Sequence, residues 1–432
     1  MQLMNPRYKE SSRFHSQVKN IIPGASQTFS KSSTQYPVGI SPLFVEKAKG
    51  AYVWDIDNNR YFDLVNSLAA ITLGYRNRTV DRSVKKQLKK GSIFSLPGKL
   101  EAEVAEQIIN LVPSAEQVRF GKNGTDATTA AIRLARSYTG RDDVAVCGYH
   151  GWQDWYIGST SRNKGVPESV SNHTHTFKYN DLESLKEINA ACPNGLAAVI
   201  LEPMNSDWPA PGWLESIRHF CDQNGAILIF DETITGFRFK AGGAQEEFNV
   251  LPDLTTLGKG IANGFPLSAI TGKRELMQEM NEIFYSGTFG GDLISLAAAK
   301  AVLGLHQKED ITGKLGKIGN ELANNVNEII SNVGLEGCFS LSGHPTWKIL
   351  KWQDHEIASS AEIKTLFLQE MFKRGVLILS SHNVSLSMNP RKISQISQIY
   401  AEVLNLISSA LNKGTVKVLL EAPPLVPLFR VR

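Results

Sequence analysis

Short segments made only of apolar residues alternate with helical segments in the middle of this sequence. Residues 197–201 read Ala-Ala-Val-Ile-Leu and residues 226–230 read Ala-Ile-Leu-Ile-Phe. A strand that is apolar at every position is typical of a parallel sheet buried on both faces. An Ala-rich helix is predicted to about Ser137, with Gly140 just past its end. This alternation predicts an α/β fold in which helices cover a mostly parallel central sheet.

The composition excludes several classes of protein. The chain has 432 residues, of which 42% are hydrophobic and 20% charged, a balance typical of a globular protein with two or three domains. The net charge is only +4 and the basic residues are scattered, so no nucleic acid or membrane partner is expected. The four cysteines form no Cys-x-x-Cys pair, so neither disulfides nor a metal site is expected. A polar N-terminus and short apolar runs predict a cytoplasmic protein.

The sequence pattern divides the chain into three regions. Residues 1–64 form an N-terminal segment that ends in a predicted hairpin, with a tight turn at Asp57-Asn58-Asn59. Residues 65–308 carry the alternating strands and helices of a large domain. Residues 309–432 predict a smaller C-terminal α/β domain, and we expect the N-terminal segment to pack with it.

A candidate phosphate-binding motif lies at the start of the Ala-rich helix. Asn123, Gly124 and Thr125 follow a short predicted strand at residues 117–120. Free N–H groups at a helix N-terminus bind phosphate, Gly124 allows close approach of the backbone, and Thr125 offers a hydroxyl group. The alternative interpretation is a capped helix after a tight turn, with no ligand.

Two further motifs follow predicted buried strands. Asp231 ends one strand at the sheet edge where open α/β proteins bind ligands, and Thr233 lies two residues beyond it. Lys259 stands between two glycines, and a buried lysine with a lowered pKa is suited to form a Schiff base. A Walker A loop is excluded, because Gly260 stands where serine or threonine is required. A loop salt bridge for Asp231 and a solvated Lys259 are the alternatives.

An aromatic motif completes this set. Tyr149 and His150 follow a predicted strand at residues 144–147, where Tyr149 is a candidate stacking surface and His150 is either a base or a packed side chain. A phosphate cradle, an aromatic ring, an acidic strand end and a lysine, in this order along one sheet, are what a pyridoxal 5′-phosphate (PLP) site requires. In this interpretation Asp231 keeps the pyridine nitrogen protonated and Lys259 forms the Schiff base.

These motifs resemble those of the class III, or ω-type, aminotransferases of PLP fold type I. The resemblance is carried by the segments FGKNGTDATTAAIRLAR, YHGW, VILEPM, ILIFDETITGF, PDLTTLGKGIANGFPLSA and SGTFGG, which occur in the order of the family. Within the family the chain is most similar to the glutamate-1-semialdehyde 2,1-aminomutases. The similarity covers about residues 23–403.

The resemblance implies roles for individual residues. Lys259 is implied to be the Schiff-base and proton-transferring lysine, and Asp231 the partner of the pyridine nitrogen. Thr288 falls where a neighbouring subunit reaches the phosphate, so a homodimer with shared active sites is implied. The full set of cofactor-binding candidates is Asn123, Gly124, Thr125, Tyr149, His150, Glu202, Asp231, Thr233, Lys259 and Thr288.

The substrate-binding segments depart from the aminomutase pattern. Lys31 stands where the aminomutase has the arginine that binds the substrate carboxylate, and lysine cannot make the two-pronged contact of a guanidinium group. Residues 380–385 replace the aminomutase gate near the C-terminus. Aromatic and polar residues expected to line the substrate pocket are Trp152, Trp155, Tyr156, Trp208, His382 and Asn383.

Three functions remain open at this stage. The first is a PLP-dependent aminotransferase that moves an amino group from an amino-acid donor to an aldehyde or keto acceptor, with polysaccharide or secondary-metabolite synthesis as the expected setting. The alternative is an aminomutase-type isomerase with the same cofactor. The third, a non-catalytic nucleotide-binding protein, is disfavoured because the Walker A pattern is absent.

Overall fold

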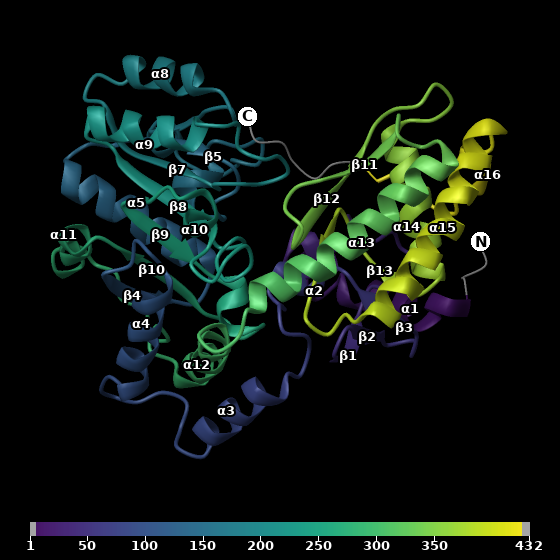
Figure 1. Ribbon diagram of the computed structural model, residues 1–432, viewed down its shortest axis with the longest axis horizontal. Helices are drawn as coiled ribbons and strands as arrows, with labels where there is room; N and C mark the ends of the chain where they lie inside the picture. Colours follow the sequence, from purple (N-terminus) through teal and green to yellow (C-terminus); the bar gives the residue numbers. More distant parts are fainter. Residues whose placement is uncertain (1–5, 426–432) are drawn as a thin grey trace. The chain divides into compact units, whose positions relative to one another are not determined.

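The chain forms two compact units. A computed structural model describes residues 6–425, so residues 1–5 and 426–432 of the predicted terminal regions lie outside the described residues. Among the described residues, the large unit runs from Arg78 to Gly313, and the small unit combines residues 6–77 with residues 314–425 (Figure 1). The sequence pattern placed residues 65–77 in the large domain, whereas in the structure they belong to the small unit. Tyr75 accounts for this, because it pairs with Gly50 and its hydroxyl donates a hydrogen bond of 2.6 Å to Asp63.

A seven-stranded sheet forms the centre of the large unit, in the order β4-β10-β9-β8-β7-β5-β6. Neighbouring strands from β9 to β6 are parallel, whereas β10 is antiparallel to both β4 and β9. Every residue of β7 and β8 is buried, which confirms the predicted mostly parallel sheet. The strands are β4 (Gln117–Gly121), β5 (Asp143–Cys147), β6 (Thr174–Thr176), β7 (Leu196–Leu201), β8 (Ile227–Glu232), β9 (Leu254–Leu257) and β10 (Ser268–Gly272).

Helices cover both faces of this sheet because successive side chains of a strand point in opposite directions. Ile200 and Ile229 pack beneath α5 (Gly124–Thr139), which ends at Gly140 in the left-handed conformation with φ 65°. Val199 and Leu228 belong to the core on the opposite face, which includes residues of α8 and α9. The other helices of this unit are α3 (Arg78–Leu88), α4 (Lys99–Leu111), α6 (Asp154–Ile157), α7 (Glu168–Ser171), α8 (Leu182–Ala191), α9 (Trp213–Asn224), α10 (Ala244–Phe248), α11 (Arg274–Met277) and α12 (Leu293–His306).

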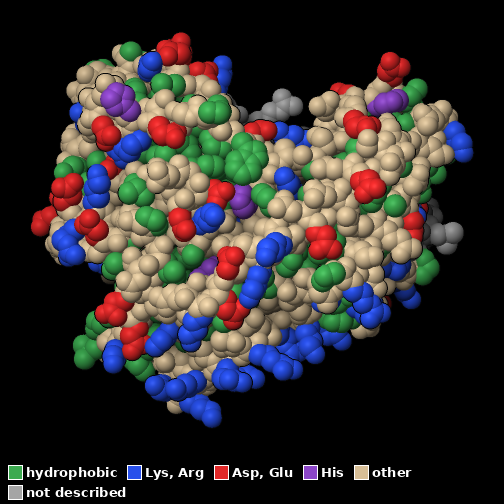
Figure 2. All heavy atoms as spheres, in the orientation of Figure 1, with side chains coloured by type: hydrophobic (Ala, Val, Ile, Leu, Met, Phe, Trp, Pro, Cys, Tyr) green, Lys and Arg blue, Asp and Glu red, His purple; other side chains and the backbone are tan. Residues whose placement is uncertain are grey.

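Basic side chains are less scattered than the sequence suggested. Helix α3 carries Arg78, Arg82, Lys85 and Lys86 against a single acidic residue, Asp81. Figure 2 shows Lys and Arg side chains gathered along the lower edge of the view, where α3 lies in Figure 1. Within residues 6–425, no helix has the length and hydropathy needed to cross a bilayer.

The small unit contains two sheets with helices packed on them. The first has the order β1-β2-β3-β13 and the second the order β11-β12-β14. Strand β13 pairs in parallel with β3, so the C-terminal part of the chain completes the N-terminal sheet. The strands are β1 (Val45–Lys49), β2 (Tyr52–Asp55), β3 (Arg60–Asp63), β11 (Phe339–Ser342), β12 (Trp347–Trp352), β13 (Val376–Leu377) and β14 (Ser381–Asn383). The longer helices are α1 (Lys9–Val18), α13 (Ile311–Val333), α14 (Ser360–Lys373) and α15 (Pro390–Asn412).

The predicted N-terminal hairpin was wrong in one respect, because the segment holds three strands rather than two. A reversal at Gly50, where φ is 62°, separates β1 from β2. The predicted turn at Asp57-Asn58-Asn59 then separates β2 from β3. Glycine adopts a positive φ without a steric penalty, which allows the additional reversal.

Candidate active site

The parallel register of the large sheet brings the predicted motifs to one edge. Cys147 lies beside Leu201, Leu201 beside Phe230, and Asp231 beside Thr256, so the four strands end level with one another. The carboxyl ends of such strands are where open α/β proteins bind ligands. The candidates that follow or end these strands are Tyr149, His150, Glu202, Asp231, Thr233 and Lys259.

Asp231 lies at the centre of a hydrogen-bond network and is only 5% exposed. One carboxylate oxygen, Oδ2, lies 2.9 Å from Nδ1 of His150. The other, Oδ1, accepts hydrogen bonds from the Thr256 hydroxyl at 3.0 Å and from the Thr233 backbone N–H at 3.1 Å. Three different segments therefore fix the orientation of this carboxylate.

The contacts of Asp231 also favour its charged form. Burial acts to raise the pKa of Asp231, but the hydrogen bond and charge of His150, together with Thr233, outweigh it and hold the pKa below the usual 3.8. The second ring nitrogen of His150, Nε2, lies 3.1 Å from the Cys147 carbonyl oxygen. The ring of His150 therefore lies between two oxygen atoms, which fixes its position beside Asp231. The pair presents an ionised, oriented carboxylate at the sheet edge.

Lys259 lies two residues past the end of β9, after Gly258, and begins a short 3₁₀ helix, Lys259–Ala262. Its backbone has a φ of 39°, a left-handed conformation that is strained for a residue other than glycine. Burial lowers the pKa of Lys259, although the negative charges of Glu202 and Asp231 act in the opposite direction. A lowered pKa leaves more of the amine neutral near pH 7, which is the form that acts as a nucleophile or base.

The start of α5 packs closely against the residue that follows Asp231. A Cβ atom added at Gly124 would lie 3.0 Å from Cγ2 of Thr233, and one added at Gly258 would lie 3.1 Å from the same atom. Two glycines from different loops therefore allow Thr233 to fit between the first turn of α5 and the residue before Lys259. This packing places Gly124 beside the segment that carries Asp231.

The first turn of α5 uses some of its polar groups within the protein. The carboxylate of Asp126 accepts hydrogen bonds from the backbone N–H groups of Lys122 and Asn123, at 2.9 and 2.8 Å. The Thr125 hydroxyl oxygen accepts a hydrogen bond of 3.3 Å from the backbone N–H of Trp152. The N–H groups of Gly124 and Thr125 lie in the first turn, where a helix provides no acceptor of its own. They are therefore the N–H groups of this turn best placed for an anion.

Glu202 lies against the loop that carries Tyr149. Its Oε2 accepts a hydrogen bond of 3.2 Å from the backbone N–H of Tyr149, and burial raises the pKa of Glu202. Gly148 makes this contact possible, since it has a φ of 107° and a Cβ there would lie 2.4 Å from the same oxygen. The ring of Tyr149 remains 49% exposed and meets Tyr156 edge-on at 5.7 Å between ring centroids.

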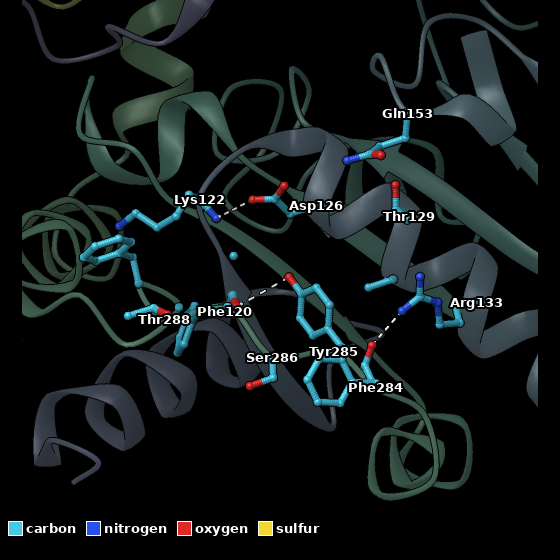
Figure 3. A pocket seen from close by; sticks show the side chains of 15 residues that line it. Phe120, Lys122, Asp126, Thr129, Arg133, Gln153, Phe284, Tyr285, Ser286 and Thr288 are labelled. Carbon is cyan, nitrogen blue, oxygen red and sulfur yellow. Dashed lines mark hydrogen bonds between the residues drawn. The ribbon is translucent and has the colours of Figure 1, made fainter. Parts of the chain in front are cut away.

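Thr288 occupies a different place from the other candidates within this chain. It lines a pocket of about 350 Å³ between the loop of residues 284–290 and the start of α5, with Lys122, Asp126 and Arg133 among its other residues (Figure 3). Asp231 and Lys259 do not line that pocket. Thr288 is exposed, as are Phe284 and Phe289 beside it, which are 79% and 61% exposed.

Several residues expected to line a substrate pocket are core residues instead. Trp155 and Tyr156 are 6% and 0% exposed and belong to the core beneath α5. His382 is 1% exposed, and its Nε2 lies 2.6 Å from the Tyr400 hydroxyl in the small unit. Asn383 is also buried and donates a hydrogen bond of 2.8 Å to the Val65 carbonyl oxygen. The predictions for these four residues were wrong, because sequence composition does not reveal side-chain direction.

The burial of His382 predicts a loss of stability in acid. Burial, followed by the charge of Lys348, lowers the pKa of His382 from 6.5 to about 3. Between these values the unfolded chain binds a proton that the folded chain does not, so stability falls as the pH falls. Acidification from pH 7 to pH 5 should therefore cost about 2 kcal/mol of unfolding free energy through this residue. Urea unfolding of wild type and His382→Gln at both pH values measures this, and an unchanged difference between the two proteins would contradict it.

Two residues near Asp231 have roles that the motifs did not reveal. Thr256 donates to Asp231 because it lies directly beside it in the parallel register of β8 and β9. From the sequence, the position of Thr256 beside Asp231 could be found only by aligning the two predicted strands in parallel register. Glu232, the second acidic residue of the motif, is a structural group that accepts hydrogen bonds from Gln245 and from the Thr235 hydroxyl.

Comparison with known proteins identifies the class to which this geometry belongs. Residues 35–411 match the family model for class-III aminotransferases. A glutamate-1-semialdehyde 2,1-aminomutase of Syntrophobacter fumaroxidans is 35% identical over 399 residues, which cover 86% of this chain and 89% of that protein. The structure of an omega-transaminase from Sphaerobacter thermophilus has a TM-score of 0.82 and 25% identity, with 92% of this chain and 98% of that chain covered. The FumI protein of Sphingopyxis sp. MTA144 has a TM-score of 0.87 and 24% identity, with 97% and 99% covered.

The chain therefore belongs to the class III aminotransferase family. It is an enzyme of a family that depends on PLP, and its fold is the type I fold of PLP-dependent transaminases, so the predicted family, fold and cofactor are confirmed at this level. Its relatives include proteins named as aminomutases and proteins named as transaminases.

Proposed function

We propose that this enzyme is an aminotransferase that moves an amino group from an amino-acid donor to an aldehyde or keto acceptor by a ping-pong mechanism, with Lys259 as its Schiff-base lysine. The observation that carries the proposal is that Asp231, in β8, and Lys259, two residues past the end of β9, lie at the same edge of two adjacent parallel strands. The pKa of the lysine is lowered by burial, and the carboxylate is ionised and held by three donors.

The residues of this edge fit PLP in three respects. Asp231 offers an oriented carboxylate for a protonated ring nitrogen, with His150 and Thr256 behind it. Gly124 has no side chain where Thr233 packs against the first turn of α5, and N–H groups at the start of a helix are suited to bind a phosphate. Tyr149, with its ring half exposed, is suited to stack on an aromatic ring. We propose that the other candidates surround the cofactor and hold the residues that contact it; they are Asn123, Thr125, Glu202 and Thr233.

The chain itself supplies orientation and proton transfer. PLP held at this edge by Lys259 and Asp231 would supply an electron sink for the electron pair that remains when the α-proton is removed. Lys259 Nζ removes and returns that proton, since its neutral form is favoured by burial. Asp231 keeps the ring nitrogen protonated, and the hydrogen bond from His150 maintains the charge of the carboxylate.

An aminomutase is the second candidate, and the names of the curated relatives at 34–35% identity favour it. The observation against an aminomutase is that Lys31 stands where that enzyme has an arginine for the substrate carboxylate. Lys31 lines a largely apolar cavity of about 580 Å³ in the small unit, and among the described residues it is the one Lys or Arg in that lining. A carboxylate at this cavity would therefore meet a point charge rather than the planar fork of an arginine.

Incubation of the purified enzyme with glutamate alone separates the two candidates. An aminotransferase completes the first half of a ping-pong cycle without an acceptor, so it should release about one equivalent of 2-oxoglutarate per active site. A strict aminomutase has no released product and should yield none. The assay is repeated with alanine, with pyruvate as the measured product, to detect an aminotransferase that uses alanine rather than glutamate as its donor. Release of neither oxo acid would contradict the proposal for these donors.

The role of Lys31 can be tested separately. We expect Lys31→Ala to raise the KM for one substrate about fivefold while the cofactor content stays unchanged, because one exposed charge contributes about one kcal/mol to binding. Lys9→Ala, which removes another lysine of the N-terminal segment, is the matched control. Unchanged kinetics in Lys31→Ala would show that this cavity does not take part in substrate binding.

We also propose that the enzyme is a homodimer with shared active sites. Thr288 is exposed, lies away from Asp231 and Lys259 in its own chain, and is flanked by two exposed phenylalanines, which suits a loop that inserts into a partner. Sedimentation analysis should give twice the monomer mass. A monomer that retains full activity would contradict this proposal.

A further inference from the structure

A second cluster of ligand-type side chains lies at the opposite edge of the large sheet from Asp231. Asp143 is the first residue of β5, His175 belongs to the edge strand β6, and Cys192 directly follows α8. One potential ligand atom from each lies within 4.8 Å of the others. Because β5 and β6 are parallel, this is the amino-terminal edge of the strands, and the cluster plays no part in the site described above.

Strand pairing explains why these three residues meet. Ala145 pairs with His175, and the backbone N–H of Val144 donates a hydrogen bond of 3.0 Å to the carbonyl oxygen of His173. Asp143 and Ala145 share one face of β5 because side chains alternate along a strand. Ala145 packs in the same core cluster as Cys192, beneath α8. The rigid framework of the sheet and α8 therefore holds the three side chains on one face.

The carboxylate of Asp143 contacts two imidazole rings in this cluster. Oδ1 of Asp143 lies 2.9 Å from Nε2 of His175 and 3.1 Å from Nδ1 of His173. Cys192 is 7% exposed, whereas the side chains of His173 and His175 are 44% and 32% exposed. The thiol is thus buried on the inner side of the cluster, and the imidazoles leave a route to solvent on the outer side.

We propose that Asp143, His175 and Cys192 bind a zinc ion. A thiolate, an imidazole and a carboxylate are the three ligand types that Zn²⁺ takes in proteins. Zinc–ligand distances of about 2.0–2.3 Å in a tetrahedron separate the ligand atoms by about 3.4–3.6 Å. The present spacing, from 2.9 Å to within 4.8 Å, brackets this value, so side-chain rotation without movement of the strands completes the site.

Zinc binding at this site would release one proton, because the Cys192 thiol gives its proton to solvent when the Zn–S bond forms. His175 would bind through Nε2 as the neutral imidazole, with its one ring proton on Nδ1. His173 keeps its contact with the carboxylate and orients it, as groups around a ligand commonly do. A water molecule would take the fourth position of the tetrahedron. The ion would tie edge strand β6 to β5 and to the end of α8.

Metal analysis of the holoenzyme tests this proposal. The protein is treated with EDTA, desalted, incubated with ZnSO₄ and desalted again, and zinc is measured by mass spectrometry of the metal. We expect one zinc per chain in wild type and a loss of at least about tenfold in retained zinc in Cys192→Ser and in His175→Gln. Cys338→Ser and His219→Gln, which remove a cysteine and a histidine elsewhere, should retain it. Equal zinc in all five proteins, or none in wild type, would overturn the proposal.

A second measurement needs no variant. Cys192 is compared with the buried cysteines Cys147, Cys221 and Cys338 in the same wild-type sample, by mass spectrometry after slow alkylation with iodoacetamide. Zinc should slow the labelling of Cys192 about tenfold or more and leave the other three unchanged, because a coordinated thiolate is less available to the reagent. Equal labelling of Cys192 with and without zinc would contradict the site. The visible absorbance of the bound cofactor should not change, which separates this site from the catalytic one.

Discussion

Lys259→Ala should lower kcat by at least about 10⁴-fold while the protein still folds and binds PLP without a covalent bond. General base catalysis alone contributes about 10²–10⁴-fold, and this variant also loses the residue that joins the cofactor to the protein. The two other lysines near these motifs are held elsewhere, because Lys122 is bound to Asp292 at 2.8 Å and Lys273 to Asp253 at 2.6 Å. Both salt bridges belong to the folded large unit and remain in the variant.

Borohydride reduction followed by peptide mapping measures the covalent part of this prediction. Wild type should carry the reduced cofactor on the peptide that contains Lys259, and Lys259→Ala should carry none. Lys122→Ala and Lys273→Ala are matched controls, and both should retain the label and the absorbance of the lysine-bound cofactor. A label on any lysine other than Lys259 would overturn the assignment of the whole site.

The sequence predicts the arrangement of this site because the arrangement follows from strand order and parallel pairing. The apolar runs before Glu202 and Asp231 mark two buried strands, and parallel strands end at a common edge. The relative positions of Asp231 and Lys259 then depend only on the register of β8 and β9. A single sequence shows short apolar runs that mark buried strands. It also shows glycines that end helices, such as Gly140 after α5.

Side-chain direction and long-range pairing are not visible in the same way. Trp155 and His382 were expected near the substrate, yet each points into a core, because the pattern of a short loop does not show which way a ring turns. The cluster of Asp143, His175 and Cys192 was missed for a related reason. Its members lie on three separate segments, and only the pairing of β5 with β6 and the end of α8 bring them together.

The second large effect is expected at Asp231. Asp231→Asn keeps the shape of the side chain and leaves Lys259 intact, so the reduced cofactor should still be found on Lys259. The amide carries no charge, and an ionised carboxylate about 4 Å from a cation contributes about 4 kcal/mol at an effective dielectric constant near 20. If that contribution is expressed in the transition state, kcat should fall about 10³-fold.

Thr256→Val is the matched control for Asp231, since it removes one hydrogen bond to Oδ1 and preserves the charge. One hydrogen bond to a charged group is worth about 1.5–3 kcal/mol, so we expect a loss of about 10- to 10²-fold, smaller than that of Asp231→Asn. Comparing the loss of kcat in the two variants shows whether the charge of the Asp231 carboxylate or its orientation contributes more to the rate. If Thr256→Val were as damaging as Asp231→Asn, the carboxylate would act mainly through its position in the network. If Asp231→Asn kept more than about a tenth of the wild-type rate, Asp231 would not be the group that maintains the protonated ring nitrogen.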